Sequence, residues 1–273
     1  MPELPDLTIV AEQLAARITG RTVLDATAPA PILVRATPAE LATLQGAVVG
    51  PARRRGKFLL LPFERDGKPT RVLAANPMLA GRFWLLEDGS AKVRARTGLR
   101  LRFTDGGELR YVDREMLGKL YLVASDALDV IPGWPEMGPD ADDPELTLEA
   151  FRQRIRRHPG ELKSLLRNSR FVAGIGNAYS DEILWEARLA PLRKRSSLKP
   201  EDIDRLYGAM RSVLGDAVVR LRDLVPPNIE LQHREFLKVH LRGGEPCPRC
   251  GNALRQIGGS EATTFCRTCQ PPF

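Results

Sequence analysis

The spacing of apolar residues divides the chain into parts of different character. Near the start, apolar residues recur every three or four positions, which predicts an amphipathic helix over residues 5–18. Gly20 follows as a stop signal. Such a helix would anchor the beginning of the chain against a core. The residues of the stripe are Leu7, Val10, Leu14 and Ile18.

Residues 21–123 carry short β-prone runs instead, and glycine-rich turns such as Asp105-Gly106-Gly107 separate several of them. Leu99 to Phe103 alternates apolar and basic residues, as a half-buried strand does. Many short strands with tight turns predict a sandwich or barrel. One short helix is expected within it, over residues 38–44. The β-prone runs are residues 21–24, 32–34, 47–49, 58–61, 71–73, 82–86, 99–103 and 109–112.

The second half is helical. Residues 126–146 contain four prolines and many acidic residues, which is typical of a linker. The helices expected beyond it are residues 148–157, 162–168, 177–187 and 201–222. The fold class predicted is α+β. The domains predicted are a β-sandwich (1–125), a linker (126–146), a helical domain (147–232) and a small C-terminal domain (233–273).

The charge and composition of the chain indicate the class of partner that it binds. The 273 residues carry a formal charge of +7, with a pI of about 9.5, which favours an acidic partner such as nucleic acid. No apolar run approaches the roughly 20 residues that a membrane span needs. The N-terminus lacks the pattern of a secretory signal. We therefore expect a cytoplasmic, nucleoid-associated monomer without membrane contact.

All four cysteines lie in the last 27 residues, as two Cys-x-x-Cys pairs separated by fifteen residues. This spacing places four thiolates around one Zn²⁺, in a closed and therefore structural site. Two redox pairs are the alternative. The predicted ligands are Cys247, Cys250, Cys266 and Cys269.

Two further stretches suit a phosphate backbone. Gly174 and Gly176 precede a predicted helix whose N-terminus offers free N–H groups, and Asn177 caps it or donates to phosphate. Residues 151–199 hold twelve Lys and Arg against four Asp and Glu, a net of +8, and include Lys163. Residues 53–57 form another cationic cluster, expected to be a loop that touches DNA. The alternatives are a tight interhelical turn and solvated basic faces.

The chain opens with Pro2 and Glu3. If Met1 is removed, the nitrogen of Pro2 becomes a secondary amine with a pKa near roughly 8, which is partly unprotonated at neutral pH. Such an amine can attack a sugar aldehyde carbon to form an iminium ion, and Glu3 can transfer protons to the same sugar. The alternative is that Pro-Glu is only the tip of a loop.

In this order the motifs resemble the formamidopyrimidine-DNA glycosylase and endonuclease VIII family of bifunctional base-excision enzymes. The resemblance covers essentially the whole chain. The matching motifs are Met1-Pro2-Glu3-Leu4-Pro5-Asp6, Arg54-Arg55-Gly56-Lys57, residues 173–182 with the helix–two-turn–helix signature, and the four cysteines followed by Gln270.

The resemblance implies roles for single residues. Pro2 would attack C1′ of the damaged nucleotide, after the base has left the stack, and Glu3 would shuttle protons. Lys57, Lys163 and Asn177 would hold phosphates, with Lys57 close to the chemistry and Arg55 beside it. The family's fold implies a basic cleft for duplex DNA that contains a damaged base or an abasic site, with strand cleavage by β- or β,δ-elimination.

The sequence departs from the family at the groups that fill the space left by the flipped base. Leu79 replaces the family's intercalating methionine, unless Met78 takes that role, and Leu117 replaces its phenylalanine wedge. Glu115 stands where an arginine pairs with the orphaned base, and Glu261 replaces the arginine of the zinc hairpin. Asn76 replaces the histidine that begins the family's segment around the intercalating methionine. A preference for 8-oxoguanine therefore does not carry over.

We expect a zinc-finger DNA glycosylase with AP lyase activity that removes damaged bases, oxidised ones in particular. Two alternatives stay open. One is an AP lyase or glycosylase for unusual lesions, with little activity on 8-oxoguanine. The other is a damaged-DNA-binding protein without catalysis, which an intact Pro2-Glu3 pair argues against. The sequence does not specify the lesion, the opposite base, the elimination type or any protein partner.

Overall fold

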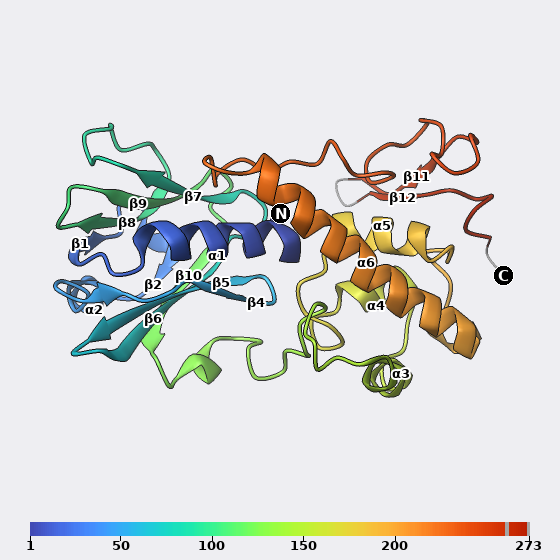
Figure 1. The fold of residues 1–273 in the computed structure, drawn as a ribbon, viewed down its shortest axis with the longest axis horizontal. Coiled ribbons are helices and arrows are strands. Elements are labelled where there is room, and N and C mark those ends of the chain that lie inside the picture. The colour runs from blue at the N-terminus through green and yellow to red at the C-terminus, as the bar shows by residue number, and fades with distance from the viewer. Residues whose placement is uncertain (260–261, 272–273) are drawn as a thin grey trace. The chain divides into compact units, whose positions relative to one another are not determined.

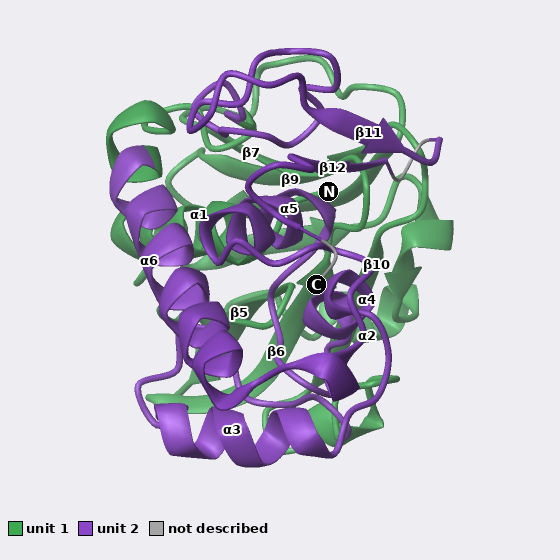
Figure 2. Ribbon diagram, turned by 90° about the vertical axis from the view of Figure 1, so that its right-hand side faces the viewer, with its two compact units in different colours: residues 1–135, 221–232 green, residues 136–220, 233–273 purple. Residues whose placement is uncertain are grey.

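The computed structural model describes residues 1–259 and 262–271, in two compact units. The first unit comprises Met1–Pro135 and Leu221–Gln232, coloured green in Figure 2. Two β-sheets, antiparallel except where β2 pairs with β10, form its body. The first has the order β1 (Val23–Thr27), β8 (Thr97–Phe103), β9 (Glu108–Asp113), β7 (Gly81–Leu86). The second has the order β2 (Val34–Arg35), β10 (Lys119–Ala124), β6 (Lys68–Asn76), β5 (Phe58–Arg65), β3 (Val48–Val49), with β4 (Arg53–Arg55) paired to β5.

Apolar side chains of both sheets meet in one core. In β8, Leu99, Leu101 and Phe103 are buried while Arg100 and Arg102 between them are not, which confirms the alternation expected from the sequence. Helix α1 (Leu4–Ile18) runs along the sandwich and adds its apolar stripe to the same core (Figure 1). The predicted helix and the predicted sandwich are confirmed. The first unit also contains α2 (Pro38–Ala42) and the 3₁₀ turns Pro31–Leu33 and Leu128–Val130.

Two strands were not expected from the sequence. The basic cluster at residues 53–57, expected as a loop, contains strand β4, and only Gly56 and Lys57 form the turn to β5. A strand was missed here because three arginines in a row carry no apolar alternation. Strand β10 was also missed, although it lies in the middle of the second sheet.

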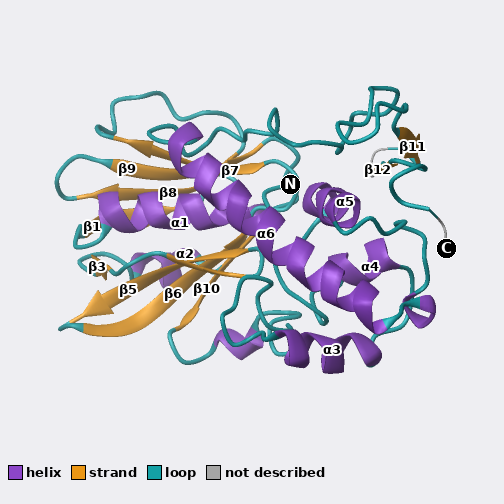
Figure 3. Cartoon of the chain, turned by 45° about the vertical axis from the view of Figure 1, so that its right-hand side comes forward, coloured by secondary structure: helices purple, strands orange, loops and turns teal. Residues whose placement is uncertain are grey.

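The second unit comprises Glu136–Arg220 and His233–Phe273. Its helices are separated by loops, and a small hairpin lies near the C-terminus (Figure 3). These elements are α3 (Leu148–Arg156), the short helix α4 (Leu162–Arg167), α5 (Asn177–Glu186), the 3₁₀ turn Arg195–Ser197, α6 (Pro200–Leu224) up to Arg220, and strands β11 (Arg255–Ile257) and β12 (Thr263–Phe265). The four helices predicted for this region are confirmed, with ends shifted by one or two residues.

The division between the units differs in detail from the domains expected. It falls between Pro135 and Glu136, inside the predicted linker. Residues 221–232, expected with the helical domain, belong to the first unit, because Ile229 is buried in the core of the sandwich. No helix of residues 1–259 and 262–271 is long and apolar enough to cross a membrane.

Candidate active site

The start of α1 fixes the first residues of the chain. Glu3 is the N-cap residue and is 2% exposed. Its N–H donates to Oδ2 of Asp6 at 2.8 Å, and the two residues form a capping box. Pro2 is buried directly before this cap. The backbone at the predicted nucleophile is therefore held by the helix end and not by a loop tip.

A small cavity of about 20 Å³ opens against Pro2. Its wall includes Asp6 from α1, Arg82 from β7, and Ile229 and Gln232 from the returning segment 221–232. The side chain of Gln232 bridges Met1 and Arg82. Its Nε2 donates to the Met1 carbonyl at 3.2 Å, and its Oε1 accepts from Arg82 Nη2 at 2.7 Å. The sequence did not point to Arg82 or Gln232: Arg82 lies on β7, and the return of the chain after α6 brings Gln232 to it and to the first residues of the chain.

Lys57 lies in the two-residue turn between β4 and β5, where Gly56 adopts a φ of 56°. This left-handed backbone favours glycine. Arg54 ties the turn to α1, because its Nε donates to Thr8 Oγ1 at 3.1 Å and its Nη1 donates to the Gly56 carbonyl at 3.1 Å. Arg55 is half-buried on β4. The turn that carries Lys57 is thus fastened to the helix that begins at Pro2.

Leu79 occupies the turn between β6 and β7 and is 49% exposed. Asn76 supports the turn, since its Oδ1 accepts from the Met78 N–H at 3.2 Å, and Met78 has a φ of 49°. A large apolar side chain is therefore presented to solvent on a fixed backbone. This is the placement expected of a residue that enters a base stack.

Glu115 and Leu117 lie in the turn between β9 and β10, and Leu117 is 46% exposed. The buried carboxylate of Asp113 organises this turn by accepting the N–H groups of Glu115 and Leu117 at 3.0 Å and of Gly118 at 2.6 Å. Both Glu115 and Leu117 face solvent. The turn is thus held at its base by Asp113 and exposed at its tip.

In the second unit, Lys163 and Asn177 converge on one acceptor. Lys163 Nζ donates to the Ala262 carbonyl at 3.3 Å, and Asn177 Nδ2 donates to it at 3.0 Å. Asn177 Oδ1 is buried and has no hydrogen-bond partner among the described residues. Lys163 is 5% exposed and forms an ion pair with Asp181 at 2.6 Å. Lys163 therefore holds the zinc hairpin, a role that the sequence did not indicate.

Helix α5 carries a buried polar network. Asp181 also contacts His240 Nδ1 at 2.8 Å, while Glu182 accepts the N–H groups of Lys238, Val239 and His240 at 2.8–2.9 Å. Burial raises the pKa of Glu182 against the lowering effect of these hydrogen bonds. The network fastens α5 to the segment that leads into the zinc finger.

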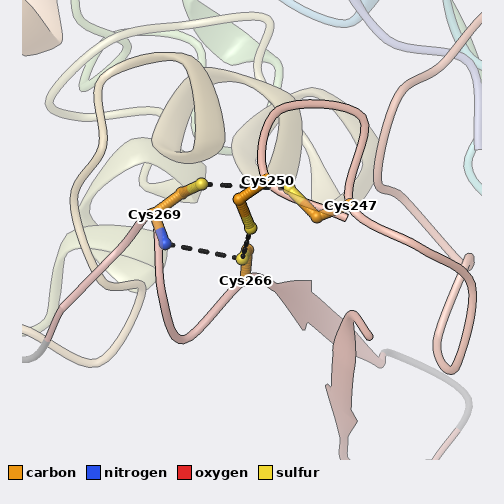
Figure 4. Close-up of side chains that lie close together, drawn as sticks. All are labelled: Cys247, Cys250, Cys266 and Cys269. Atoms are coloured by element: carbon orange, nitrogen blue, oxygen red, sulfur yellow. Dashed lines mark hydrogen bonds between the residues drawn. The ribbon is translucent and has the colours of Figure 1, made fainter. Parts of the chain in front are cut away.

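The four cysteines come together as predicted (Figure 4). Their sulfur atoms lie within 4.8 Å of one another, with Cys247–Cys269 at 3.9 Å and Cys250–Cys266 at 3.5 Å. A tetrahedral zinc with Zn–S bonds of about 2.3 Å needs sulfur pairs about 3.8 Å apart. The cysteines therefore fit one structural zinc ion.

Two side chains join this centre to the helices. Trp185 Nε1 donates to Cys247 Sγ at 3.4 Å, and Arg249 stacks over the Trp185 ring at 4.0 Å. Gln270 accepts the Cys266 N–H at 2.8 Å and donates to the Leu189 carbonyl at 2.9 Å. Glu261, the predicted departure in the hairpin, lies outside the described residues.

Comparisons with known proteins agree with this geometry. Models of the formamidopyrimidine-DNA glycosylase N-terminal domain, of its H2TH domain, and of a zinc finger found in FPG and IleRS match residues 1–120, 137–224 and 244–272. Formamidopyrimidine-DNA glycosylases of Symbiobacterium thermophilum and Bacillus cereus are each 34% identical over 99% of this chain and 90% and 99% of their own. The chain belongs to the formamidopyrimidine-DNA glycosylase family.

Solved structures of this family have the same fold. MutM in complex with DNA containing carbocyclic 8-oxo-G has a TM-score of 0.88 at 26% identity, over 99% of this chain and 100% of that one. Lactococcus lactis Fpg with DNA containing an abasic site has a TM-score of 0.86 at 27% identity, over 98% and 99%. The protein is a base-excision DNA glycosylase, and AP lyase activity is typical of its family.

Proposed function

We propose that the protein excises damaged bases with Pro2 as nucleophile and then cleaves the strand at the resulting abasic sugar. The observation that carries this proposal is the capping box that holds Glu3 beside Pro2. Fixing a catalytic group in place supplies much of the rate of an enzyme. The positive end of the α1 dipole also disfavours a second positive charge on a neighbouring amine, which keeps the nitrogen nucleophilic.

The proposed reaction begins once Met1 has been removed. The lone pair of the Pro2 nitrogen bonds to C1′, and the glycosidic bond breaks with its electron pair leaving on the base. The proton of the Pro2 nitrogen passes to the departing base, Glu3 protonates O4′ as the sugar ring opens, and an iminium ion remains at C1′. Loss of a proton from C2′ expels the 3′ phosphate, and water finally releases Pro2.

The phosphates around the flipped nucleotide are assigned to Lys57 and Asn177. Lys57 is supported by its place in a turn fastened to α1, and Asn177 by its position at the N-terminus of α5. Arg55, at the end of β4, would contact the phosphates of the same DNA strand. We assign Lys163 an indirect role, because its ion pair with Asp181 and its bond to Ala262 position the hairpin. Leu79 and Leu117 would fill the space that the flipped base leaves.

We further propose that the protein acts as a monomer on duplex DNA with a damaged or abasic site, in the bacterial nucleoid. One chain carries the candidate nucleophile, phosphate-binding groups and zinc finger, which supports a monomer. The relatives bound to 8-oxo-G and abasic-site DNA support the type of substrate. Their bacterial sources support the location.

Borohydride trapping on abasic-site DNA tests the nucleophile. We expect the wild type to form a covalent adduct, and Pro2→Gly and Glu3→Gln to form it at least about a hundredfold more slowly, the scale of acid–base catalysis. Pro29→Gly and Glu87→Gln are matched controls at exposed positions and should trap normally. Tight binding without an adduct would instead identify a damage sensor. The mass of the active protein must also show that Met1 is absent.

A narrower activity is the second candidate. Glu115 is exposed at the position where the family reads the orphaned base, and a carboxylate cannot make the contacts of an arginine. This favours an AP lyase or a glycosylase for unusual lesions over one with high activity on 8-oxoguanine. Duplexes that each carry one lesion decide between the two: strong cleavage of 8-oxoguanine opposite cytosine would exclude the narrower activity.

A further inference from the structure

A groove of about 530 Å³ lies on the first unit, next to the cavity at Pro2, with which it shares Arg82, Leu231 and Gln232. Strand β7 provides its floor with Arg82 and Trp84. Leu79 and Leu231 form apolar walls and are 49% and 50% exposed. The groove is far larger than the Pro2 cavity, and no step of the proposed reaction uses it.

The groove combines an aromatic platform with positive charge. The guanidinium of Arg94 lies over the Trp84 ring at 3.7 Å from its centroid, which extends the flat surface of the indole. Arg82 and Arg114 also line the groove, against a single acidic residue, Glu230. Flat stacking surfaces beside arginines are the chemistry that binds an unstacked nucleotide of either strand.

Buried contacts hold this arrangement in place. Arg110 is 3% exposed, and it donates to the carbonyls of Ala91 at 2.6 Å and Lys92 at 3.0 Å, which anchors the loop that carries Arg94. Glu108 binds Arg110 in turn at 2.6 Å. Burial would raise the pKa of Glu108, but Arg100 and Arg110 lower it to about 2, so the anchor stays charged. The platform is therefore built into the sheet.

The position of the groove indicates which nucleotide of the duplex it would bind. The sugar attacked by Pro2 must lie at the Pro2 cavity, which adjoins the groove through Arg82, Leu231 and Gln232, whereas Pro2 itself lines only the cavity. Leu79 does line it, and so does Arg114, the neighbour of Glu115 in the turn that reads the orphaned base in the family. A base that Leu79 displaces from the stack would therefore lie at the mouth of the groove.

We infer that this groove binds the base opposite the lesion, unstacked, on the Trp84–Arg94 platform. The inference rests on the proposed function, since it requires Leu79 to enter the duplex. It also accounts for Glu115: a protein that takes the orphaned base out of the stack does not need an arginine to pair with it inside the stack.

Binding to a non-cleavable abasic analogue tests this without catalysis. Two duplexes are compared, one with tetrahydrofuran opposite adenine and one with tetrahydrofuran opposite tetrahydrofuran, which has no base to bind. We expect Trp84→Ala and Arg94→Ala to weaken binding to the first duplex about tenfold, the scale of one base stack, and to leave the second nearly unchanged. Trp84→Phe should restore most of the affinity.

Lys92→Ala is the matched control, because it removes one charge from the same loop without lining the groove. It should affect both duplexes equally. Equal losses on both duplexes in the Trp84 variant, or no loss on either, would overturn the inference. Because tetrahydrofuran forms no iminium, borohydride trapping by the Trp84 variant separately reports whether the chemistry at Pro2 is intact.

Discussion

The proposed catalytic end of the first unit and the zinc hairpin of the second unit are held in different ways. Pro2 and Glu3 begin a helix whose apolar face lies in a large core with both β-sheets. The hairpin strands β11 and β12 are short, and the apolar cluster beside them is small. It consists of Trp185, Val239, Cys247, Leu254 and Cys266, with Cys269 packed against it. Hydrophobic burial fixes the first site, whereas ion pairs and thiolates fix the second.

This difference indicates which interaction each site depends on. A small element without its own core depends on its metal for folding. A helix end that is packed against a core depends instead on the few hydrogen bonds that satisfy its first N–H groups. Perturbing the metal, the buried charges and the cap should therefore affect the two units separately.

Removal of zinc should have the largest effect. Structural zinc sites contribute about 10–16 kcal/mol in isolated fingers, so a strong chelator should unfold the hairpin. We expect DNA binding to be lost while the sandwich keeps its amide protection in hydrogen exchange. Adding zinc back should restore binding. Loss of protection in the sandwich as well would show that the two units do not fold independently.

Asp181→Ala should be the next largest perturbation. It leaves Lys163 buried without its partner at 2.6 Å and removes the contact with His240. Breaking a buried pair from one side costs about 3–5 kcal/mol, which chemical denaturation of the second unit should show. The double variant Lys163→Met/Asp181→Ala should recover part of the loss.

Asp204→Ala is the control for this prediction, because its ion pair with Arg152 at 2.7 Å is on the surface and should contribute little. If Asp181→Ala is no more destabilising than Asp204→Ala, the buried network does not hold the hairpin.

Asp6→Ala should act at the catalytic end. It removes the acceptor of the buried Glu3 N–H, at a cost of about 1–2 kcal/mol. Because the same bond fixes Glu3 beside Pro2, we expect the rate of borohydride trapping to fall by more than the loss of stability explains. The second unit should melt as before.

Helix α2 offers a matched control for the cap. Thr37 and Glu40 form the same capping box there, with the Thr37 N–H donating to Glu40 at 2.7 Å. Glu40→Ala should leave trapping unchanged. Equal trapping rates in Asp6→Ala and the wild type would mean that the cap does not position the nucleophile.

The sequence predicts the local elements of both sites better than the contacts between distant residues. The helix at residues 5–18, the strand alternation of β8 and the four zinc ligands follow from local spacing, and the structure confirms them. Roles such as that of Lys163 depend on partners far along the chain: Asp181 is eighteen residues away and Ala262 ninety-nine. Spacing in the sequence carries no signal for such pairs.

Gln232 and Arg82 illustrate the same limit within the first unit. They meet at the Pro2 cavity only because the chain returns to the sandwich after α6. Strand β4 was missed for a different reason, since its arginines are paired to β5 through the backbone and show no apolar pattern. The sequence therefore did not predict tertiary pairing, nor a strand such as β4 whose residues show no apolar alternation.

Glu115→Arg should have the smallest effect and act only on recognition. Asp113 holds the backbone of this turn, so a new side chain at its exposed tip should not disturb the fold. An arginine that reads one base contributes roughly 1–3 kcal/mol of discrimination. We expect the wild type to bind tetrahydrofuran opposite each of the four bases with similar affinity, and Glu115→Arg to spread these affinities several-fold. Glu87→Arg, an equal charge change at an exposed residue, should strengthen all four alike. An unchanged spread in Glu115→Arg would show that this turn does not meet the orphaned base, and Leu79 alone would then separate the strands.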